Sequence, residues 1–522
     1  MKKITFPAFG EKIYHVNREN SRAIAMTVEN ADKMLFDKYS CLISESGYEK
    51  KEEYVNGSHH YAAFFNGDVG YFLNYYDGIN ELRIAEEEKC NYFSFSDNAG
   101  ENKVQPQVTQ LTLEDFGMSY AIRLSDGRFI IIDGGFNFEI DVDRLYDCLL
   151  KGSGGRKPNI ALWIFSHAHE DHFHCFIGFM KKYGDQATVQ KVLLNFPEYN
   201  DLERYPGLAG VSERFGDVSG VTNIPLMWEG VKKANAEAFM AHTGQKYTVG
   251  DAKMEILAST DDTIHVTNSI NAQALIIRME LGGQTIIWAT DSSFSYTRLP
   301  ERYGEYLKAD ILQIPHHGFQ SGTAEAEIEG YKLIAPKVCL LPTDDYIAYT
   351  FFCTFRKGTR FLMTAESVEE IITGSEQRTL TLPYAPDPEA KRRLKNKFDL
   401  GLDSDGARVW VFTELNTAND EDLIFTVLNT TVLPTTVRIE LFFEDKSHLI
   451  KSLRVDVKGS TIKRFNILGD EVEDFSKWFS GASLRKKGLP ENASFAVRFL
   501  CDTPVIVSNA KHQPTYRSTL NG

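Results

Sequence analysis

Between residues 106 and 385, short apolar runs alternate with amphipathic stretches of helical length. The apolar runs have the length and composition of buried strands and lie at 129–132, 160–165, 192–194 and 311–314. The stretches with helical periodicity lie at 141–150, 173–182 and 231–240. Alternation of this kind is typical of an α/β domain built in layers. We therefore predict a layered α/β domain over residues 106–385.

Both flanks of this domain show β patterning alone. Residues 1–105 hold short runs rich in Tyr and Phe, and the Gly after each of Asn56, Asn66 and Asp77 marks a hairpin turn. Prolines followed by a basic run interrupt the pattern, which predicts a linker at 386–403. Short alternating strands return after it. We predict a β-rich N-terminal module over 1–105 and a C-terminal β-sandwich over 404–522.

The charge balance limits the class of partner. The 522 residues include 57 Lys and Arg against 72 Asp and Glu, so the formal net charge is −15. Binding along a long nucleic acid needs a basic surface, because Lys and Arg must displace the counterions of the phosphates. We therefore do not expect a long nucleic acid as partner. A small anionic substrate remains compatible with the charge.

The sequence carries no mark of secretion or of membrane insertion. The N-terminal region lacks the apolar stretch of a signal peptide, and no apolar run reaches the roughly 18 residues that cross a bilayer. The seven cysteines are odd in number and form no Cys-x-x-Cys pair, which argues against a disulfide framework. We expect a cytoplasmic protein with reduced thiols and no membrane partner.

Histidines gather directly behind a predicted strand. Four of the thirteen lie within eight residues, at His167, His169, His172 and His174. The cluster follows the apolar run 160–165, so it belongs to the C-terminal end of a buried strand, where α/β sheets place ligand sites. Three of these imidazoles, with the carboxylate of Asp171, suit two neighbouring divalent metal ions. His174 lies further into the helical stretch and is interpreted as structural.

The spacing His-x-His-x-Asp-His at 167–172 resembles the signature of the metallo-β-lactamase fold hydrolases. Upstream, the segment 116–135 looks like the opening hairpin of the family. Downstream, the segments 250–257, 271–279, 285–291 and 310–318 follow in the order seen in the ComEC-like subgroup, which includes phosphorylcholine esterases. The resemblance covers residues 107–384 and leaves out both flanking β modules. It implies a metallo-β-lactamase-like αββα sandwich with a dinuclear metal site.

The resemblance assigns roles to the residues of the loop. In that family the first two histidines hold one metal ion and the following Asp-His pair holds the other, which here means His167 with His169 and Asp171 with His172. Asp291 stands where the family has a carboxylate that bridges the two ions. A carboxylate between two cations offsets their mutual repulsion.

A second histidine pair and one further aspartate complete the resemblance. His316-His317-Gly318 matches the His-His-Gly element of the subgroup, from which one imidazole is expected to complete the shell of the first ion. The phosphorylcholine esterases use the second histidine, so we assign His317 as the ligand and His316 as a supporting or leaving-group residue. Asp133 resembles the family aspartate that supports the metal loop from behind.

Two features depart from the family pattern. Many members have a further histidine several tens of residues before the bridging aspartate. His242 and His265 lie in that interval, but neither sits in a recognisable motif. The last ligand, often a His-Pro pair, is absent. Either the second ion is weakly held, or Asp344 or Asp345 reaches it.

Together these features predict a dinuclear metal-dependent hydrolase that uses a metal-bound hydroxide, with Asp171, His316 and His317 as catalytic residues. The nitrogen-rich ligands favour Zn²⁺, with Mn²⁺ as the alternative. The subgroup favours a small phosphodiester or a short oligonucleotide as substrate. One alternative is a carboxylic ester, lactone or amide hydrolase on the same site. Another is a non-catalytic binding or assembly protein, with a structural metal site and β modules that engage a protein or glycan.

Overall fold

In the computed structural model the chain divides into two compact units, Met1–Ala209 with Ser219–Lys391, and a second unit that contains Arg392–Gly522. The structure describes residues 4, 12–18, 21–90, 94–98, 100, 103–115, 117–196, 223–263, 269–320, 322–345, 348, 356–398, 407–416, 423–429, 434–444, 451–458, 461–467, 473–474, 494–509 and 516–517.

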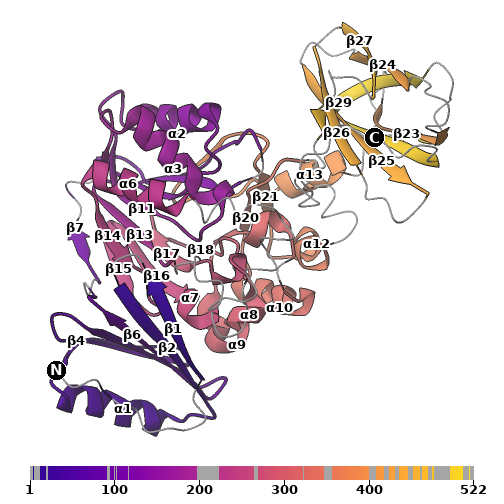
Figure 1. The fold of residues 1–522 in the computed structure, drawn as a ribbon. Helices are drawn as coiled ribbons and strands as arrows, with labels where there is room; N and C mark the ends of the chain where they lie inside the picture. The colour runs from indigo at the N-terminus through magenta and orange to yellow at the C-terminus, as the bar shows by residue number, and fades with distance from the viewer. Residues whose placement is uncertain are drawn as a thin grey trace. The chain divides into compact units, whose positions relative to one another are not determined.

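The N-terminal part of the first unit is a six-stranded antiparallel sheet in the order β1-β2-β6-β5-β4-β3 (Figure 1). Its strands are β1 (Lys12–Arg18), β2 (Ser21–Glu29), β3 (Glu49–Asn56), β4 (His59–Phe65), β5 (Gly70–Tyr76) and β6 (Glu81–Glu88). Helix α1 (Lys33–Glu45) packs on this sheet and buries Phe36, Tyr39 and Ile43 in the same core as Leu73. Sequence reasoning missed this helix, although these three residues have helical spacing.

Two eight-stranded sheets make up most of the rest of the first unit. One has the order β14-β13-β11-β10-β9-β8-β22 with β12 beside β11, and the other has the order β21-β20-β19-β18-β17-β16-β15-β7. The first contains β8 (Gln107–Gln110), β9 (Ser119–Arg123), β10 (Phe129–Asp133), β11 (Asn159–Ile164), β12 (Thr188–Val189), β13 (Lys191–Leu194), β14 (Glu237–Met240) and β22 (Arg378–Thr381). The second contains β7 (Ser96–Asn98), β15 (Lys246–Gly250), β16 (Ala252–Ala258), β17 (Ile276–Leu281), β18 (Gln284–Trp288), β19 (Ile311–Gln313), β20 (Val338–Leu341) and β21 (Glu370–Thr373).

These two sheets share one hydrophobic core. Tyr120 and Leu162 of the first sheet and Met254 and Trp288 of the second belong to the same buried cluster, and the ring centroids of Tyr120 and Trp288 are 4.8 Å apart. Apolar burial of this kind is the main force that holds two sheets together. The mixed α/β character predicted for this region is therefore confirmed.

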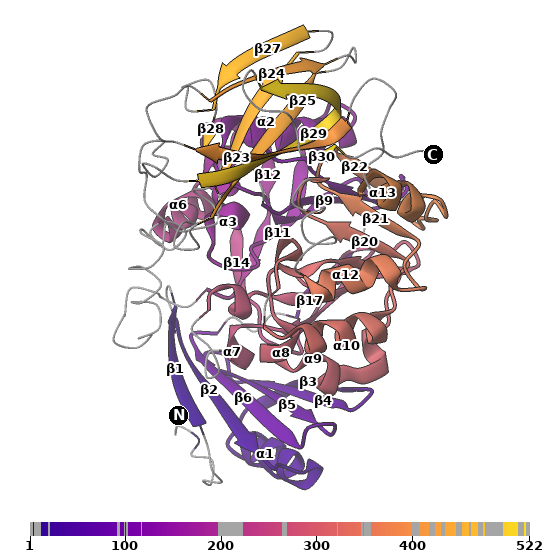
Figure 2. The same ribbon diagram turned by 90° about the vertical axis from the view of Figure 1, so that its right-hand side faces the viewer.

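Helices flank the two sheets. Figures 1 and 2 show α2 (Glu139–Gly152), α3 (Glu170–Tyr183) and α6 (Ile224–Ala234) on one side. On the other side lie the short helices α8 (Phe294–Thr297) and α9 (Leu299–Tyr303), with α10 (Ala324–Ile334) and α12 (Lys357–Thr364). The remaining short elements of the unit are α7 (Thr260–Thr263) and the 3-10 turns η1 (Asn271–Gln273), η2 (Gly304–Leu307) and η3 (Pro315–Gly318).

One predicted helix is wrong in its extent. The stretch at 231–240 was expected to be helical throughout, but α6 ends at Ala234 and β14 begins at Glu237. Asn235 between them has a left-handed backbone with φ 52°, a conformation that ends helices and that Asn tolerates better than most residues. The stretches at 141–150 and 173–182 do fall within α2 and α3, respectively.

The second unit contains an eight-stranded sheet with its own core. The order is β27-β24-β29-β25-β26-β28, with β23 beside β29 and β30. Its strands are β23 (Ala407–Asn416), β24 (Ile424–Asn429), β25 (Thr435–Phe443), β26 (Lys451–Val457), β27 (Thr461–Asn466), β28 (Glu473–Asp474), β29 (Ser494–Asn509) and β30 (Tyr516–Arg517). Phe412, Phe425 and Phe499 lie at the centre of its hydrophobic cluster. Helix α13 (Ala390–Phe398) occupies part of the region that was predicted to be a linker.

Buried charges join the N-terminal sheet to the α/β part of the first unit. The Arg83 guanidinium lies 2.9 Å from the Asp262 carboxylate, and Arg302 donates to the same carboxylate and, at 2.6 Å, to the Tyr76 hydroxyl. Beside them, the His242 ring lies between the carboxylates of Glu87 and Asp261. Arg83, Tyr76 and Glu87 lie on β5 or β6, and each contacts a residue beyond position 240.

Two expectations from the sequence concern membrane-spanning helices and cysteines. None of the helices that the structure describes is both long and apolar enough to cross a membrane. The six cysteines in the described ranges are all free thiols, Cys41, Cys90, Cys148, Cys175, Cys339 and Cys501. Cys353 lies outside those ranges.

Candidate metal centre

The histidine-rich loop is fixed by one buried aspartate. Asp133 ends β10, which runs parallel to β11, and its Oδ1 accepts a hydrogen bond from the Ser166 backbone N–H at 2.7 Å. The Ser166 hydroxyl donates to Oδ2 of the same carboxylate at 2.7 Å. Asp133 therefore supports the loop from behind, as the sequence predicts.

Two imidazoles are oriented through their Nδ1 atoms. Nδ1 of His172 lies 2.8 Å from Oδ2 of Asp133, and Nδ1 of His317 lies 3.1 Å from the backbone carbonyl oxygen of Pro342. Because the carboxylate and the carbonyl are acceptors, each Nδ1 carries a proton. Each Nε2 then faces the centre, which is the arrangement usual for metal-binding histidines.

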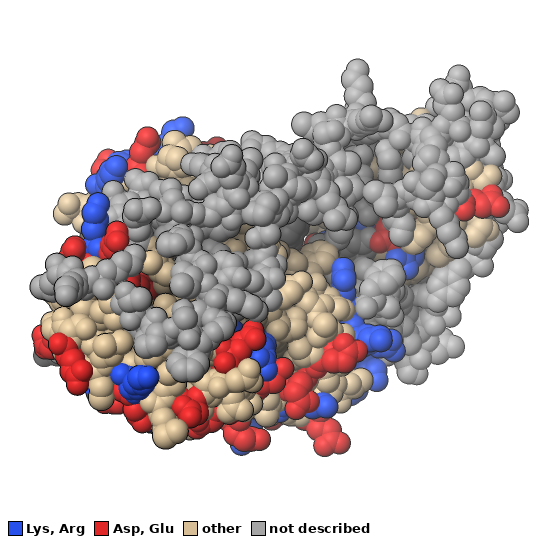
Figure 3. Space-filling view, turned by 60° about the horizontal axis from the view of Figure 1, so that its bottom comes forward, with Lys and Arg blue, Asp and Glu red and all other residues tan. Residues whose placement is uncertain are grey.

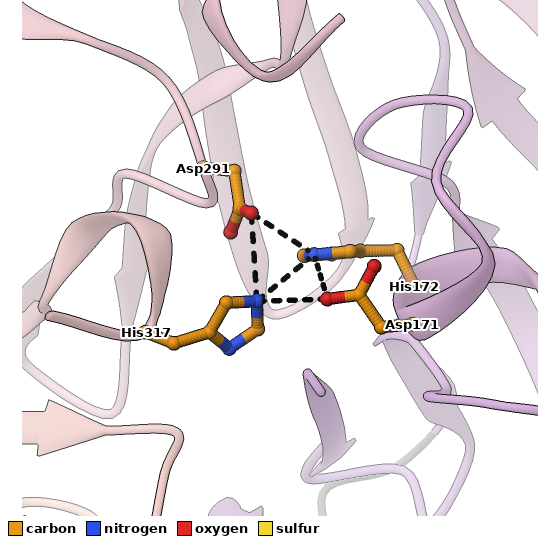
Figure 4. A group of neighbouring side chains, drawn as sticks. All are labelled: Asp171, His172, Asp291 and His317. Carbon is orange, nitrogen blue, oxygen red and sulfur yellow. Dashed lines mark hydrogen bonds and ion pairs between the residues drawn. The ribbon is translucent and has the colours of Figure 1, made fainter. Parts of the chain in front are cut away.

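Four buried residues converge on one point. Asp171, His172, Asp291 and His317 each offer one ligand atom, and these four atoms lie within 4.8 Å of one another (Figure 4). Nε2 of His317 is 3.1 Å from Oδ2 of Asp171 and 3.4 Å from Oδ2 of Asp291, and Nε2 of His172 is 3.3 Å from the latter. Ligand atoms about 2.1 Å from a tetrahedral ion lie about 3.4 Å apart. The donor set therefore fits one divalent ion.

A second group lies beside the first. Nε2 of His167 is 3.1 Å from Nδ1 of His169, 3.0 Å from Oδ1 of Asn271 and 3.9 Å from Oδ2 of Asp291. The Asn271 amide nitrogen is in turn 2.9 Å from Nε2 of His316, which lies 4.0 Å from Oδ2 of Asp291. Asp291 is thus adjacent to both groups.

One oxygen at the centre has no hydrogen-bond partner among the described residues. It is Oδ1 of Asp291, which is buried. Buried carboxylate oxygens in proteins are normally hydrogen-bonded, paired with a cation or bound to a metal. This oxygen therefore fits a second cation shared by the same carboxylate.

The backbone of the His-His-Gly element has an uncommon conformation. His316 and His317 have φ of 51° and 52°, in the left-handed region that residues other than Gly rarely adopt. The backbone N–H of His316 donates to the carbonyl oxygen of Thr290 at 2.8 Å, which ties the element to the residue before Asp291. Such conformations persist where the surroundings enforce them and are frequent at functional sites.

Helix α3 begins earlier than the periodicity indicated, and two of the predicted ligands belong to it. It starts at Glu170, so Asp171 and His172 lie in its first turn. The Asp171 carbonyl oxygen accepts from the Met118 backbone N–H at 3.0 Å, and the His172 carbonyl oxygen accepts from Gly135 at 3.1 Å. The start of the helix is therefore attached to residues that flank β9 and β10.

His317 groups with a different pair than expected. The resemblance led us to expect His317 beside His167 and His169, but the distances above place its Nε2 with Asp171 and His172. The reason is topological: η3 follows β19, and it approaches the first turn of α3 rather than the loop before it.

The described histidine considered as a further ligand does not join the centre. His242 is enclosed by Glu87 and Asp261, which fully occupy both of its ring nitrogens. His265 lies outside the described residues. His174 points to Glu170, with Nδ1 3.7 Å from Oε2.

The two aspartates considered as a last ligand are also not part of the metal group. Asp345 accepts a hydrogen bond from the Thr373 hydroxyl on β21. Neither Asp344 nor Asp345 belongs to the group of described donors that can reach one ion. Asn271, by contrast, was missed as a site residue, because an amide has no spacing signature; its place at the head of the family-like segment 271–279 was the available signal.

Charge is distributed unevenly over the centre. Burial by itself lowers the pKa of His317, but the carboxylates of Asp291 and Asp171 outweigh it and raise that pKa to about 9. Burial and the neighbouring imidazoles keep the pKa of His167 well below its usual value, and burial lowers the pKa of His316 to about 4. Negative charge is therefore concentrated beside His317 and is weaker beside His167.

Comparison with known proteins gives one family. Residues 113–233 match the model of the metallo-beta-lactamase superfamily. The matched segment contains Asp133 and the loop 167–172, whereas Asp291, His316 and His317 lie beyond it. No curated protein matches the chain.

Solved structures add little. The Anabaena sensory rhodopsin transducer is 17% identical, over 21% of this chain and 86% of its own, with a TM-score of 0.16. The structure of Thermotoga maritima 1070 is 17% identical, over 22% of this chain and 97% of its own, with a TM-score of 0.15. Likeness at this level carries no argument about fold or function.

Proposed function

We propose that the protein is a metal-dependent hydrolase whose active site is the centre around Asp291. The observation that carries this proposal is the convergence of Asp171, His172, Asp291 and His317 from separate segments onto one buried point. The match of residues 113–233 to the metallo-beta-lactamase superfamily supports it, because that segment supplies the loop at the centre.

We assign two divalent ions to this centre. Asp171, His172 and His317 would hold one, His167 and His169 would hold the other, and Asp291 would be shared. Imidazole nitrogens combined with carboxylate oxygens favour Zn²⁺, with Mn²⁺ as the alternative. When bound, such ions supply an activated water and neutralise the charge that develops on the reacting group.

The residues of the chain hold and orient the reacting groups. Asp133 and the Pro342 carbonyl fix the two imidazoles that face Asp291. His316 is only partly buried, with 24% of its side chain exposed, so we assign to it contact with the substrate or its leaving group. Asp171 would act at the reacting centre as a charged ligand of the same ion as His317, whose Nε2 lies 3.1 Å from its Oδ2.

A small phosphodiester or a short oligonucleotide is the substrate class that we propose. The segments that resemble the ComEC-like subgroup favour phosphodiester chemistry. The net charge of −15 disfavours an extended polyanion. Figure 3 shows one face of the molecule, and over its described part Lys and Arg lie interspersed with Asp and Glu and form no broad basic area. This also supports a small substrate over an extended polyanion.

Metal analysis combined with turnover tests the proposal. Full-length protein should hydrolyse bis(p-nitrophenyl) phosphate, lose activity on chelation and regain it with Zn²⁺ or Mn²⁺. His169→Ala should lose the ion assigned to His167 and His169, and activity with it. His60→Ala is the matched control, since His60 lies on the N-terminal sheet and pairs with Asp77 at 3.2 Å, and it should behave as wild type.

The outcomes separate the parts of the proposal. Failure of both isolated and metal-reconstituted protein to bind metal would overturn it. Metal-dependent cleavage of p-nitrophenyl acetate or of a lactone without diesterase activity would keep the hydrolase and replace the substrate class. Bound metal without any hydrolysis would favour a structural metal site.

A further inference from the structure

We infer that Asn271 is a ligand of the ion held by His167 and His169, and that the two metal positions are therefore unequal. The position at Asp171, His172 and His317 fills first, and the Asn271 position fills second and more weakly. This inference rests on the proposed function in one respect, namely that the centre binds metal.

Asn271 is held against the histidine loop by the backbone that follows it. It opens the η1 turn, and four residues later the Leu275 backbone N–H donates to the carbonyl oxygen of Ser166 at 3.1 Å. This hydrogen bond ties the segment to the residue directly before His167. The backbone that follows Asn271 thus sets its position beside the loop.

The Asn271 amide has its oxygen toward the histidine pair. Oδ1 is 3.0 Å from Nε2 of His167, which is itself 3.1 Å from Nδ1 of His169. These separations are close to those of atoms that share one ion. On its other side, the amide nitrogen lies 2.9 Å from Nε2 of His316. An amide nitrogen only donates and the ring nitrogen accepts, so this contact keeps the oxygen turned to His167.

His316 is the nearest further imidazole, but its Nε2 faces the Asn271 amide nitrogen at 2.9 Å, so we do not assign it to this place. His242, the one described histidine between α3 and Asp291, is occupied by Glu87 and Asp261. A neutral amide oxygen is a weaker donor for Zn²⁺ than an imidazole, because nitrogen ligands suit this ion better. The third ligand is therefore the weak one.

Charge makes the difference between the two positions larger. The first position has two carboxylates, Asp171 and Asp291, with two imidazoles. The second has two imidazoles, one neutral amide and only a share of Asp291, whose Oδ1 has no hydrogen-bond partner among the described residues. An additional carboxylate in direct contact attracts a divalent cation strongly in a buried site. We expect the two dissociation constants to differ by at least about tenfold.

Titration of the metal-free, full-length protein tests the inference. Zn²⁺ is added in competition with a chromophoric chelator, and Co²⁺ spectra report the ligands of each ion. Wild type should bind two ions in two steps. Asn271→Ala should lose only the weaker step or weaken it at least about tenfold, as removal of a metal-site partner commonly does. Asn271→His should strengthen that step and change the Co²⁺ spectrum of the second ion.

Asn74→Ala is a matched control. Asn74 also contacts a buried histidine, with Oδ1 2.8 Å from Nε2 of His59, but in the N-terminal sheet, away from any metal-binding carboxylate pair. It should bind both ions as wild type does. Circular dichroism shows whether each variant folds. If Asn271→Ala does not fold, Asn271→Asp, which keeps the size of the side chain, replaces it and should tighten the weaker step.

Each result decides between the claims. Two results would overturn the inference and leave the proposed function intact. One is that the two ions bind with equal affinity, both in wild type and in Asn271→Ala. The other is that Asn271→Ala loses the tighter step. If wild type binds no ion under any condition, the proposed function itself fails. Loss of the weaker step alone, with the tighter step unchanged, is the result that supports the inference.

Discussion

Oδ2 of Asp133 lies 2.8 Å from Nδ1 of His172, and both side chains are fully buried. This contact fixes the ring so that Nε2 points toward Asp291. The same carboxylate holds the backbone of Ser166. One residue that touches no substrate therefore sets the position of the loop and of one imidazole.

Asp133→Asn should weaken metal binding by about 10–100-fold, because an amide is a poorer acceptor for the imidazole N–H than a carboxylate. Chelator competition measures the change. Asp143→Asn on the surface of α2, where Asp143 pairs with Lys182 at 2.7 Å, is the control and should have no effect on affinity. Unchanged affinity in Asp133→Asn would contradict the supporting role.

Removal of the metal should lower the melting temperature of the first unit. Without a cation, the buried carboxylates of Asp171 and Asp291 are balanced only by neighbouring imidazoles. A ligand present at about 1,000 times its Kd stabilises the folded state by about 4 kcal/mol. Differential scanning fluorimetry with chelator and after readdition of Zn²⁺ measures this. A melting temperature that does not respond to either treatment would contradict metal binding at this centre.

His242 should make stability depend on pH, independently of the metal. Burial by itself lowers its pKa, but Asp261 and Glu87 outweigh this and raise it to about 9, above the value of about 6.5 in the unfolded chain. The stabilisation is therefore complete below about pH 6.5 and is lost as the pH rises through about 9, with a full size of roughly 3 kcal/mol.

His242→Gln isolates this contribution. Unfolding of wild type and variant, both loaded with metal, is compared at pH 7 and pH 10. The gap in stability between them should be smaller at pH 10, where the wild-type imidazole has lost its proton. A gap that is equal at the two pH values would show that His242 is not charged in the folded protein.

Arg302 should be essential for attachment of the N-terminal sheet. Its side chain is fully buried and contacts both Asp262 and Tyr76. Removal of one partner of a buried pair leaves the other charge uncompensated, so Arg302→Met should lower the free energy of unfolding by about 3–5 kcal/mol. Arg298→Met is the control, because 44% of the Arg298 side chain is exposed and its pairing is screened, which predicts a loss below about 1 kcal/mol.

The sequence is informative where chemistry and strand periodicity coincide. His167, His169, Asp171 and His172 follow an apolar run, so the sequence alone predicts their place at the end of a buried strand, which is β11. Asp291 follows β18 in the same way. Because β11 and β18 belong to different sheets, periodicity places each segment at the end of a strand, and it is the resemblance to the metallo-β-lactamase fold that predicts their convergence.

Other features depend on contacts that periodicity does not contain. The contact between η3 and α3 decides which pair of ligands His317 joins, and no pattern in the sequence predicts that contact. Asn271 carries no spacing motif, since one amide in a polar segment resembles any other. Periodicity carries the predicted helix past the end of α6, because Asn235, which ends it, sits inside an otherwise regular apolar pattern.

The attachment of the first turn of α3 to the residues that flank β9 and β10 offers a way to observe the site. The Met118 and Gly135 amides donate to the carbonyl oxygens of Asp171 and His172, so their hydrogens exchange with solvent only when that turn opens. Deuterium uptake at these two amides therefore reports motion of the turn from positions outside the centre. The occupancy of the site can thus be measured at the backbone of two neighbouring segments, without a label on any side chain.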